Sequence, residues 1–427
     1  MSKLNILIVG ASIAGPTAAY WFAKAGANVT VIERFPQLRT AGQQIDIRSV
    51  GVSVMRKMDG MEEAVRRNLA PMEGMQLVRG DGRPIATMNK TGDAEQQSLV
   101  SEFEIFRGDL SRIMYDMTKD QVMYVFNEQV TAMHHSADGP ITVDFLNGHP
   151  TTVYDLVVAC DGATSRTRAI GFDCAVRDHV VSNHYWAAFF SIKDDLLKGS
   201  LMGQAYTTIG GRFLAIGPDP TGINRVTLQS MHPPTKTEKD TTRPFREASK
   251  AGITALKTHV AERFAGSGWQ WEQIEKGMMA TEDFYASESV QVHMPSLSKG
   301  HFVLVGDAGY AGGPTGMGTS LAMAGAYLLA GEIATHKTNL SAGLQAYEDR
   351  MRPILKDLQK PPPGVTTAMA PQTAWGICVR NWILWGVTCV MAMGPAFSWI
   401  GALFGTAFAG AEKYDIPDYE WEVSSSS

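Results

Sequence analysis

The sequence predicts an α/β protein with a parallel sheet in its first domain, an inserted strand-rich second domain and a helical C-terminal extension. The chain opens with an apolar run, a helical pattern and a second apolar run. Together these form a βαβ unit, which requires a parallel sheet. Short alternating segments fill the middle of the chain, and a buried-strand pattern followed by a long helical pattern returns near residue 300. This return indicates that the strand-rich middle is inserted into the first domain.

Length and composition narrow the class of protein. The chain has 427 residues, of which 44% are hydrophobic, so it can bury a large core and is neither a disordered chain nor a disulfide-stapled miniprotein. The net charge of −5 offers no basic face, and we expect no nucleic-acid partner. The four cysteines are scattered and form no Cys-x-x-Cys pair. We therefore expect reduced thiols, no metal site and a cytoplasmic protein.

The first elements are a strand at 4–9, a helix at about 13–25 and a strand at 28–32. The uncharged stretch from residue 4 could also be a secretory signal or a membrane span. Two glycines and a proline interrupt it, however, and its start has the pattern of a buried strand. A strand followed by a helix is therefore the favoured interpretation.

The turn between this strand and helix carries the first chemical motif, Gly10-Ala11-Ser12-Ile13-Ala14-Gly15. A dinucleotide pyrophosphate needs a turn without side chains together with the exposed N–H groups of a helix start. Ser12 replaces the usual middle glycine. Glu33 ends the second strand, where a carboxylate can accept hydrogen bonds from an adenosine ribose. These residues predict a Rossmann-like dinucleotide site, although a glycine-rich turn beside a surface glutamate would look similar.

The elements that follow alternate between strands and helices. Hairpin turns at Asp138-Gly139 and Asn147-Gly148 separate several of the strands. We expect helices at 50–58 and 109–117, strands at 122–126, 129–134, 141–146, 151–159, 186–192, 201–209, 213–216 and 225–230, a helix ending near 264, a strand at 300–305 and a helix at 319–336.

Three further motifs lie at the ends of predicted strands. Asp307 follows the strand at 300–305, and Gly316-Met317-Gly318 opens the long helix after Pro314. An aspartate at this place can hold a polyol hydroxyl, and a glycine-rich helix start suits the negative charge of a reduced flavin. Asp161-Gly162 follows the strand at 151–159, and Arg107 could meet a phosphate or a ribose. Each motif alone is also compatible with a local turn or a surface arginine.

In this order, the motifs resemble those of the FAD-dependent aromatic hydroxylases, the single-component flavin monooxygenases of the p-hydroxybenzoate hydroxylase type. The similarity is greatest to the branch of tetracycline-monooxygenase-like and natural-product tailoring enzymes, and it spans about residues 4–355. It implies a Rossmann-like FAD-binding domain with an inserted β-sheet substrate domain. We expect residues 1–71, 99–176 and 281–340 in the FAD-binding domain, 72–98 and 177–280 in the substrate domain, and 341–427 in a C-terminal helical region.

The resemblance implies non-covalent FAD, with NADPH or NADH as a transient co-substrate beside it and no second dinucleotide domain. The residues that the resemblance places on FAD follow one another along the chain. They comprise the loop at the pyrophosphate, the carboxylate at the ribose, residues near the adenosine, the loop beside the isoalloxazine, and the residues at the ribityl chain and the flavin ring. These positions are Gly10, Ser12, Ala14, Gly15, Glu33, Arg34, Gln44, Arg48, Arg107, Asp161, Asp307, Pro314, Gly316, Met317 and Gly318.

Three positions depart from the pattern of the family. Tyr310 stands where many relatives have histidine, Met317 where many have glutamine, and Gly325 where aspartate is common. We expect the departures to leave FAD binding in place, but they weaken the transfer of the family's polar active-site roles to this chain.

The implied activity is a monooxygenase reaction in which reduced flavin and O₂ give a C4a-hydroperoxide. One oxygen atom would enter an apolar aromatic or polyketide/terpenoid-like molecule of secondary metabolism. No protein side chain is assigned as catalytic, because the cofactor performs the difficult step. Alternatives are an alkene epoxidase at a membrane and a non-catalytic flavin-binding protein. A halogenase is disfavoured because Trp269-Gln270-Trp271 lacks the proline that completes the halogenase motif.

The predicted substrate pocket lies on the strands of the middle domain. Alternation of side chains indicates that only some candidates face it. The candidates are Trp186, Phe189, Phe190, Met202, Gln204, Tyr206, Arg212, Phe213 and, in the first domain, Tyr310.

The segment 381–411 contains no Asp, Glu, Lys, Arg or His. It is long enough for a membrane span, but Gly394-Pro395 divides it. We expect two short helices, at 381–393 and 396–410, which pack on the body and partly cover the substrate entrance. Contact of one face with a membrane and a true span are the alternatives.

Overall fold

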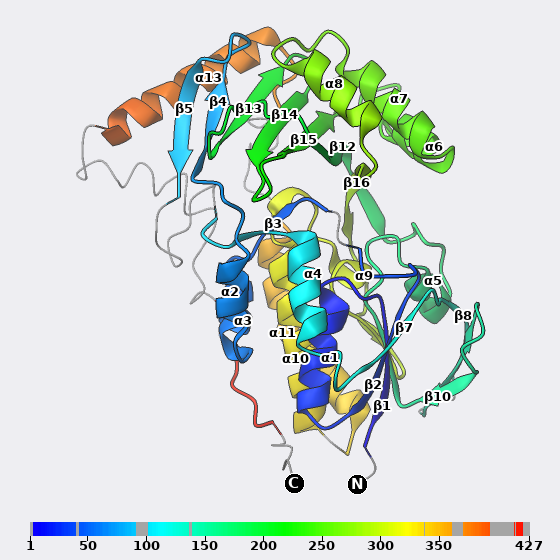
Figure 1. Ribbon diagram of the computed structural model, residues 1–427. Coiled ribbons are helices and arrows are strands. Elements are labelled where there is room, and N and C mark those ends of the chain that lie inside the picture. Colours follow the sequence, from blue (N-terminus) through cyan, green and yellow to red (C-terminus); the bar gives the residue numbers. More distant parts are fainter. Residues whose placement is uncertain are drawn as a thin grey trace.

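The computed structural model describes residues 3–39, 42–90, 101–135, 139–336, 338–360, 370–392, 414 and 416–421. The chain forms a lower domain around a six-stranded sheet and an upper domain around a seven-stranded sheet (Figure 1). The α/β class and the inserted second domain are therefore confirmed.

The lower sheet is parallel apart from one edge strand. Its core pairs β1 (Asn5–Val9) with β2 (Asn28–Glu33) on one side and with β11 (Leu156–Ala159) on the other. β7 (Met123–Phe126) extends the sheet beyond β2, and β18 (Phe302–Leu304) with antiparallel β17 (Ser298–Lys299) extends it beyond β11. The central strands are buried on both faces, which explains their unbroken apolar runs.

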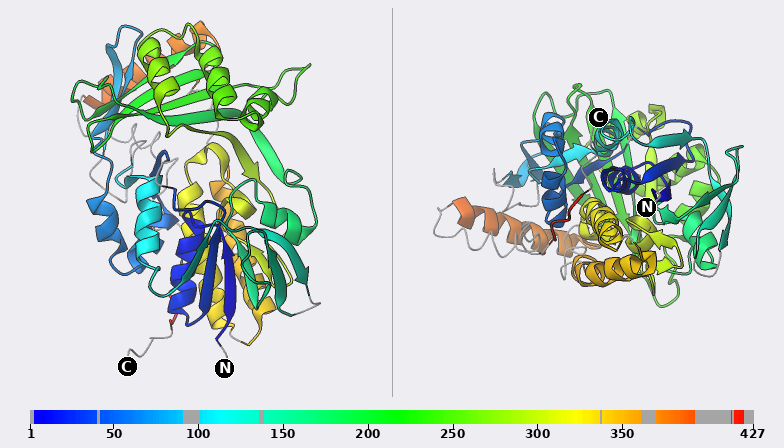
Figure 2. Two further views of the ribbon diagram at one scale, coloured as in Figure 1. Left: turned by 45° about the vertical axis from the view of Figure 1, so that its right-hand side comes forward. Right: turned by 90° about the horizontal axis from the view of Figure 1, so that it is seen from below.

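Helices and a small sheet cover the two faces of the lower sheet (Figure 2, left). One side carries α1 (Ala14–Lys24), α10 (Gly318–Thr335) and α11 (Leu340–Leu358), and the other carries the three-stranded sheet of β8, β9 and β10. The remaining elements of this domain are α2 (Val50–Lys57), α3 (Met61–Arg67), α4 (Arg107–Asp116), α5 (Arg166–Phe172), α9 (Asp307–Tyr310), η1 (Gly313–Thr315), β8 (Val130–His135), β9 (Ile141–Phe145) and β10 (Thr152–Tyr154).

The upper sheet has the strand order β16-β12-β15-β14-β13-β4-β5. One face is covered by α6 (Arg243–Lys250), α7 (Ile253–Phe264) and α8 (Trp271–Ala280). Its strands are β16 (Tyr285–Val292), β12 (Val180–Ile192), β15 (Asn224–Met231), β14 (Arg212–Pro218), β13 (Met202–Thr208), β4 (Gly74–Val78) and β5 (Pro84–Asn89). A two-stranded ladder of β3 (Gln44–Asp46) and β6 (Glu104–Phe106) lies between the domains in Figure 1.

Side-chain alternation assigns the two faces of the upper sheet. Trp186 and Leu214 point to the helices, where they join Phe264 and Trp271 in a buried cluster. Their neighbours in sequence, such as Phe213, point to the opposite side. We call this second side the open face, and it comprises Ala187, Phe189, Ala205, Thr207, Phe213, Ala215, Arg225, Thr227 and Gln229.

Two expected domain boundaries differ from the structure. β16 pairs with β12 along its length, so the upper sheet extends to Val292 rather than ending at 280. The helix α11, expected in a separate C-terminal region, buries Leu344, Tyr347 and Met351 in the core of the lower domain. The first boundary is set by strand pairing and the second by the packing of a helix in the core, and the sequence displays neither.

The end of the chain returns to the lower domain. Trp421 stacks on Trp21 with ring centroids 4.8 Å apart, and Tyr419 donates a 2.7 Å hydrogen bond to Glu332. The first helix expected in the uncharged segment is present as part of α13 (Ala374–Ala392), whereas the second, at 396–410, lies outside the described residues. In the part of the chain that the structure describes, no helix is long and apolar enough to cross a membrane.

Candidate active site

The turn after β1 is built for close approach of a ligand to the backbone. Gly10 has φ +108°, and a Cβ there would lie 2.6 Å from the carbonyl oxygen of Cys160. A Cβ on Gly15 would lie 1.9 Å from the carbonyl oxygen of Gly10. Only glycine fits at either position, so the turn stays narrow and the first N–H groups of α1 remain available to a phosphate.

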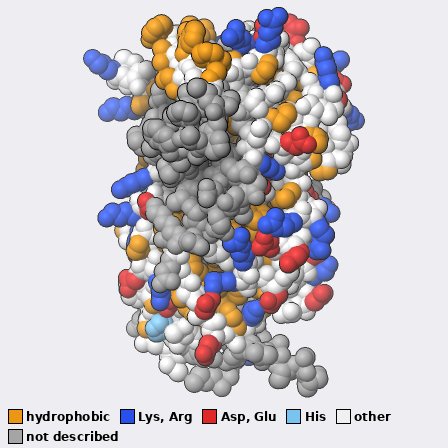
Figure 3. Space-filling model, turned by 90° about the vertical axis from the view of Figure 1, so that its left-hand side faces the viewer, with side chains coloured by type: hydrophobic (Ala, Val, Ile, Leu, Met, Phe, Trp, Pro, Cys, Tyr) orange, Lys and Arg blue, Asp and Glu red, His pale blue; other side chains and the backbone are white. Residues whose placement is uncertain are grey.

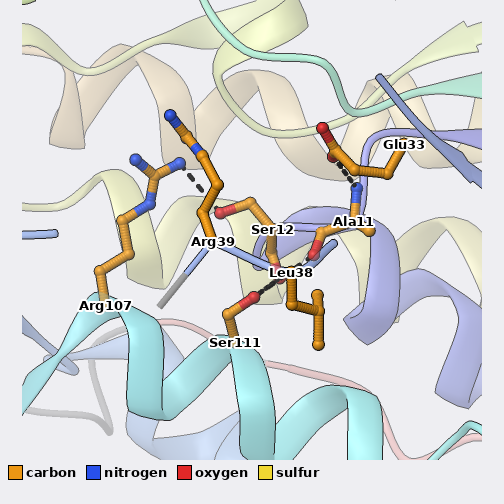
Figure 4. Close-up of a pocket in the computed structure, with 7 residues that line it drawn as sticks. All are labelled: Ala11, Ser12, Glu33, Leu38, Arg39, Arg107 and Ser111. Carbon is orange, nitrogen blue, oxygen red and sulfur yellow. Dashed lines mark hydrogen bonds between the residues drawn. The ribbon is translucent and has the colours of Figure 1, made fainter. Parts of the chain in front are cut away.

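Glu33 anchors this turn. Its two carboxylate oxygens accept hydrogen bonds from the backbone N–H of Ala11 (2.9 Å) and of Phe35 (3.1 Å). Ser12 accepts a 2.9 Å hydrogen bond from the guanidinium of Arg107, so the residue that replaces the usual glycine joins the loop to α4 (Figure 4). Ser111 on α4 donates to the carbonyl oxygen of Ser12 at 3.1 Å.

These residues line a pocket that is open to solvent, with about 330 Å³ of space including the solvent at its mouth. Two guanidinium groups, those of Arg39 and Arg107, lie on the same side of it (Figure 4). Burial and the positive charge of Arg107 lower the pKa of Arg39. An anion such as a phosphate would relieve this repulsion. Arg39 is not among the predicted residues, because an arginine in a loop after a strand has no distinguishing local pattern. The predicted Arg34 instead lies over the ring of Phe35.

Asp307 stands beside the start of α10. Its side chain is exposed to solvent. Desolvation by the surrounding protein raises the pKa of Asp307, while the positive charge of Arg107 opposes the shift. The Cβ position of Gly318 is 3.7 Å from the Asp307 carboxylate, so the aspartate and the helix start are adjacent. Pro314 and Gly316 form the turn before α10, and Met317 is buried at its N-cap.

Asp161 has a structural role within its own turn. Its carboxylate accepts hydrogen bonds from the hydroxyl of Ser165 and from both the N–H and hydroxyl of Thr167, at the start of α5. The buried Arg168 on α5 donates a 2.7 Å hydrogen bond to the carbonyl oxygen of Ala308. The segment predicted as a direct cofactor contact therefore fixes the turn that carries Asp307.

A second pocket, of about 320 Å³, lies between the loop at 42–44 and the open face. It is lined by Gly42, Gln43, Gln44, Phe106, Phe189, Phe190, Arg225, Val226, Thr227 and Asp283. The side-chain oxygen of Gln43 and the side-chain nitrogen of Gln44 are buried without a hydrogen-bond partner. A buried polar atom without a partner costs about 1–3 kcal/mol, so a heteroaromatic ring that offers both a donor and an acceptor fits this place.

Arg225 reaches this pocket from β15, and no local pattern in the sequence marks it. It binds Asp219 at 2.7 Å and Asp283 at 3.2 Å, and its guanidinium lies 4.9 Å from the centroid of the Phe106 ring. Asp219 lies six residues away in the same hairpin, whereas Asp283 and Phe106 come from distant parts of the chain. The second carboxylate therefore reaches Arg225 only in the folded protein.

Most of the predicted substrate residues lie on the helix-covered face. Trp186 stacks on Phe245 at 5.0 Å, Tyr206 packs against Trp269 at 5.6 Å, and Arg212 donates to the carbonyl oxygen of Ala265 at 3.0 Å. Met202 and Gln204 share this face with Tyr206 by alternation. Phe213 and Phe189 are on the open face, and Phe189 lines the second pocket. Phe190 also borders this pocket, but its side chain joins the cluster on the helix-covered face. Alternation fixes which residues share a face, but only the packed helices decide which face is covered.

Tyr310 is buried in the lower domain rather than in a substrate pocket. Its hydroxyl lies 3.1 Å from that of Tyr347, which donates a 2.9 Å hydrogen bond to the carbonyl oxygen of Leu304. A Cβ on Gly325 would lie 1.7 Å from the Tyr310 hydroxyl. The two departures from the family pattern are thus one change, because the tyrosine occupies the space that a side chain at 325 would need.

The predicted Arg48 is buried beside the ladder of β3 and β6. Its guanidinium binds Asp46 at 3.0 Å, and its backbone N–H donates to the hydroxyl of Ser320 on α10. Asp46 lies opposite Glu104 in the ladder. Desolvation raises the pKa of Glu104 to about 8, and the nearby Asp46 charge adds to the shift. Glu104 therefore holds a proton near neutral pH in this pair.

Replacing Glu104 with Gln should flatten the pH dependence of stability. The folded-state pKa of about 8 exceeds the ordinary value of 4.5, so the stabilising contribution of the bound proton is complete below about pH 4.5 and is lost as the pH rises toward 8. Between pH 5 and 8.5, the free energy of unfolding in urea should fall by on the order of 2 kcal/mol more in the wild type than in Glu104→Gln. The exposed Glu63→Gln is the control; an unchanged slope in Glu104→Gln would contradict the shifted pKa.

A glycine-rich loop at a helix start, an acid at the end of the second strand and a second acid beside a later helix define the class of dinucleotide-binding flavoproteins. Residues 3–360 match the family described as "FAD binding domain". The chain belongs to this family and is an FAD-dependent monooxygenase with FAD as its cofactor.

The relatives agree with this assignment. The FAD-dependent monooxygenase asL4 of Sarocladium schorii is 29% identical over 98% of this chain and 99% of that protein. The flavin-dependent monooxygenase eupH of a Phoma species is 31% identical over 88% of this chain and 90% of that protein. The crystal structure of the tetracycline destructase Tet(55) matches with a TM-score of 0.74 and 26% identity, covering 98% of this chain and 99% of that one.

Proposed function

We propose that this monooxygenase consumes NADPH or NADH and inserts one atom of O₂ into a neutral, apolar aromatic or polyketide/terpenoid-like molecule of secondary metabolism. The observation that carries the proposal is the second pocket, which joins the partnerless groups of Gln43 and Gln44 to the open face. The cofactor and the substrate would meet there.

The chemistry of the open face favours a neutral substrate. Phe213 and Ala215 are apolar, and Thr227 offers an uncharged hydrogen-bonding group. Among the strand residues of this face, Arg225 is the cation, and Asp219 and Asp283 already neutralise it. The guanidinium of Arg380, on α13, also reaches the face, where it is hydrogen-bonded to Thr207 and Asn381. A carboxylated substrate would find no available counter-charge among the strand residues. The similar protein Tet(55) is a tetracycline destructase, which accords with a multi-ring, polyketide-like substrate class.

When bound, FAD would supply the activation of O₂ after reduction by the nicotinamide. The protein would hold it non-covalently. Arg39 and Arg107 would neutralise the phosphates, and Asp307 would accept hydrogen bonds from the ribityl chain. Gln43 and Gln44 would bind the ring edge, and the open face would orient the substrate and exclude water. The nicotinamide would bind transiently, since the described residues form one dinucleotide fold.

Substrate-stimulated oxidation of NADPH tests the proposal. Neutral polycyclic phenols should accelerate NADPH oxidation and gain one labelled oxygen atom from ¹⁸O₂ by mass spectrometry, whereas their carboxylated analogues should do neither. An alkene substrate that yields an epoxide would favour the epoxidase alternative. Bound FAD without stimulated oxidation by any compound of the panel would favour a non-catalytic flavin-binding protein and overturn the proposal.

A further inference from the structure

The helix α13 has an inner side that contacts the open face. The guanidinium of Arg380 donates a 3.0 Å hydrogen bond to the hydroxyl of Thr207 on β13. Leu384 packs against the cluster of Leu77, Ala86, Ala205 and Ala215 at the β4–β5 end of the sheet. The helix therefore forms a wall of the same face that we propose for the substrate.

The outer side of α13 is exposed and apolar. The exposed fractions of Trp375, Trp382, Ile383 and Trp385 are 76%, 66%, 53% and 51%. At about 100° per residue, these side chains and Val379 share an arc of about 160°, and Arg380 and Leu384 lie opposite. Figure 3 shows a group of hydrophobic side chains at the top of this side of the molecule, and in Figure 2 (right) α13 projects from the body.

The chemistry of this outer side fits a phospholipid surface. Tryptophan prefers the interface between lipid and water, and three tryptophans share this side. The single charged residue of α13, Arg380, points inward, and the helix has no acidic residue that an anionic headgroup would repel. In the sequence, the uncharged stretch continues to residue 411. A protein partner would need a polar rim around the patch, which α13 itself does not provide.

We propose that α13 lies on a phospholipid bilayer through Trp375, Trp382 and Trp385, and that the substrate passes from this bilayer along α13 to the open face. The delivery route rests on the proposed apolar substrate. The contact with lipid rests on α13 alone, so its test needs no turnover.

Flotation of the full-length holoenzyme with phosphatidylcholine vesicles tests the lipid contact. The wild type should float with the vesicles, and the triple variant W375S/W382S/W385S should lose at least about tenfold in partition, since binding scales with the apolar area inserted. The matched control is I253S/M279S, which removes exposed apolar side chains on α7 and α8, on the other face of the sheet. It should float like the wild type, and all variants should retain equal FAD.

Three outcomes would overturn the proposal. The wild type could remain with the unbound fraction, or the triple variant could float as well as the wild type. Light scattering could instead show that the wild type is a dimer, that it does not float, and that the triple variant is a monomer. This result would assign the outer side of α13 to contact with a second copy of the chain.

Discussion

Replacing Asp307 with Ala should weaken FAD binding by about 10- to 100-fold, because a hydrogen bond to a charged group contributes about 1.5–3 kcal/mol. The carboxylate lies beside the start of α10 and near the positive charge of Arg107. In the proposed site it is the acceptor for the ribityl hydroxyls. Titration of the apoprotein with FAD, followed by flavin fluorescence, would give the dissociation constants.

Two further variants separate binding from folding in this experiment. Asp307→Asn retains an acceptor oxygen without the charge and should lie between the wild type and Asp307→Ala. Asp349→Ala removes an exposed aspartate on α11 and should bind FAD like the wild type. Equal FAD affinity in the wild type and in Asp307→Ala would remove Asp307 from the cofactor site.

Gly325→Asp should destabilise the lower domain by about 1–3 kcal/mol or more, because its Cβ would lie 1.7 Å from the Tyr310 hydroxyl in a packed core. The new carboxylate would also be buried, which adds a desolvation cost. The double variant Tyr310→His/Gly325→Asp restores the combination common in the family and should recover most of this loss. The free energy of unfolding in urea would measure all three proteins.

The control for this pair is Gly80→Asp, at an exposed turn where a Cβ would make an ordinary contact 3.7 Å from the Tyr206 hydroxyl. Its stability should stay within about 0.5 kcal/mol of the wild type, as is usual for an exposed position away from packed contacts. If the double variant were no more stable than Gly325→Asp alone, the two positions would be independent, and the structural coupling between them would be wrong.

The sequence by itself determined the parts of the site that are local. The turn Gly10–Gly15 and the acid Glu33 belong to one continuous βαβ unit, so their spacing along the chain fixes their spacing in space. The same holds for Asp307 and Gly318, which are joined by the short segment of α9 and η1 and are adjacent in the structure. The parallel sheet, the long helix α10 and the inserted domain followed from hydrophobic periodicity for the same reason.

The tertiary structure decided what depends on contacts between distant segments. Alternation along β12 and β13 shows which residues share a face of the sheet with Trp186 and with Tyr206. Only the structure shows that α6 to α8 cover this face, so that Trp186 and Tyr206 lie on the side opposite the open face. The ion pair of Arg225 with Asp283 and the fit of Tyr310 over Gly325 join residues that no local pattern relates. The periodicity of a sequence shows which residues of one helix or strand share a side. Whether that side is buried depends on the element that packs against it. Only the tertiary structure determines which element that is.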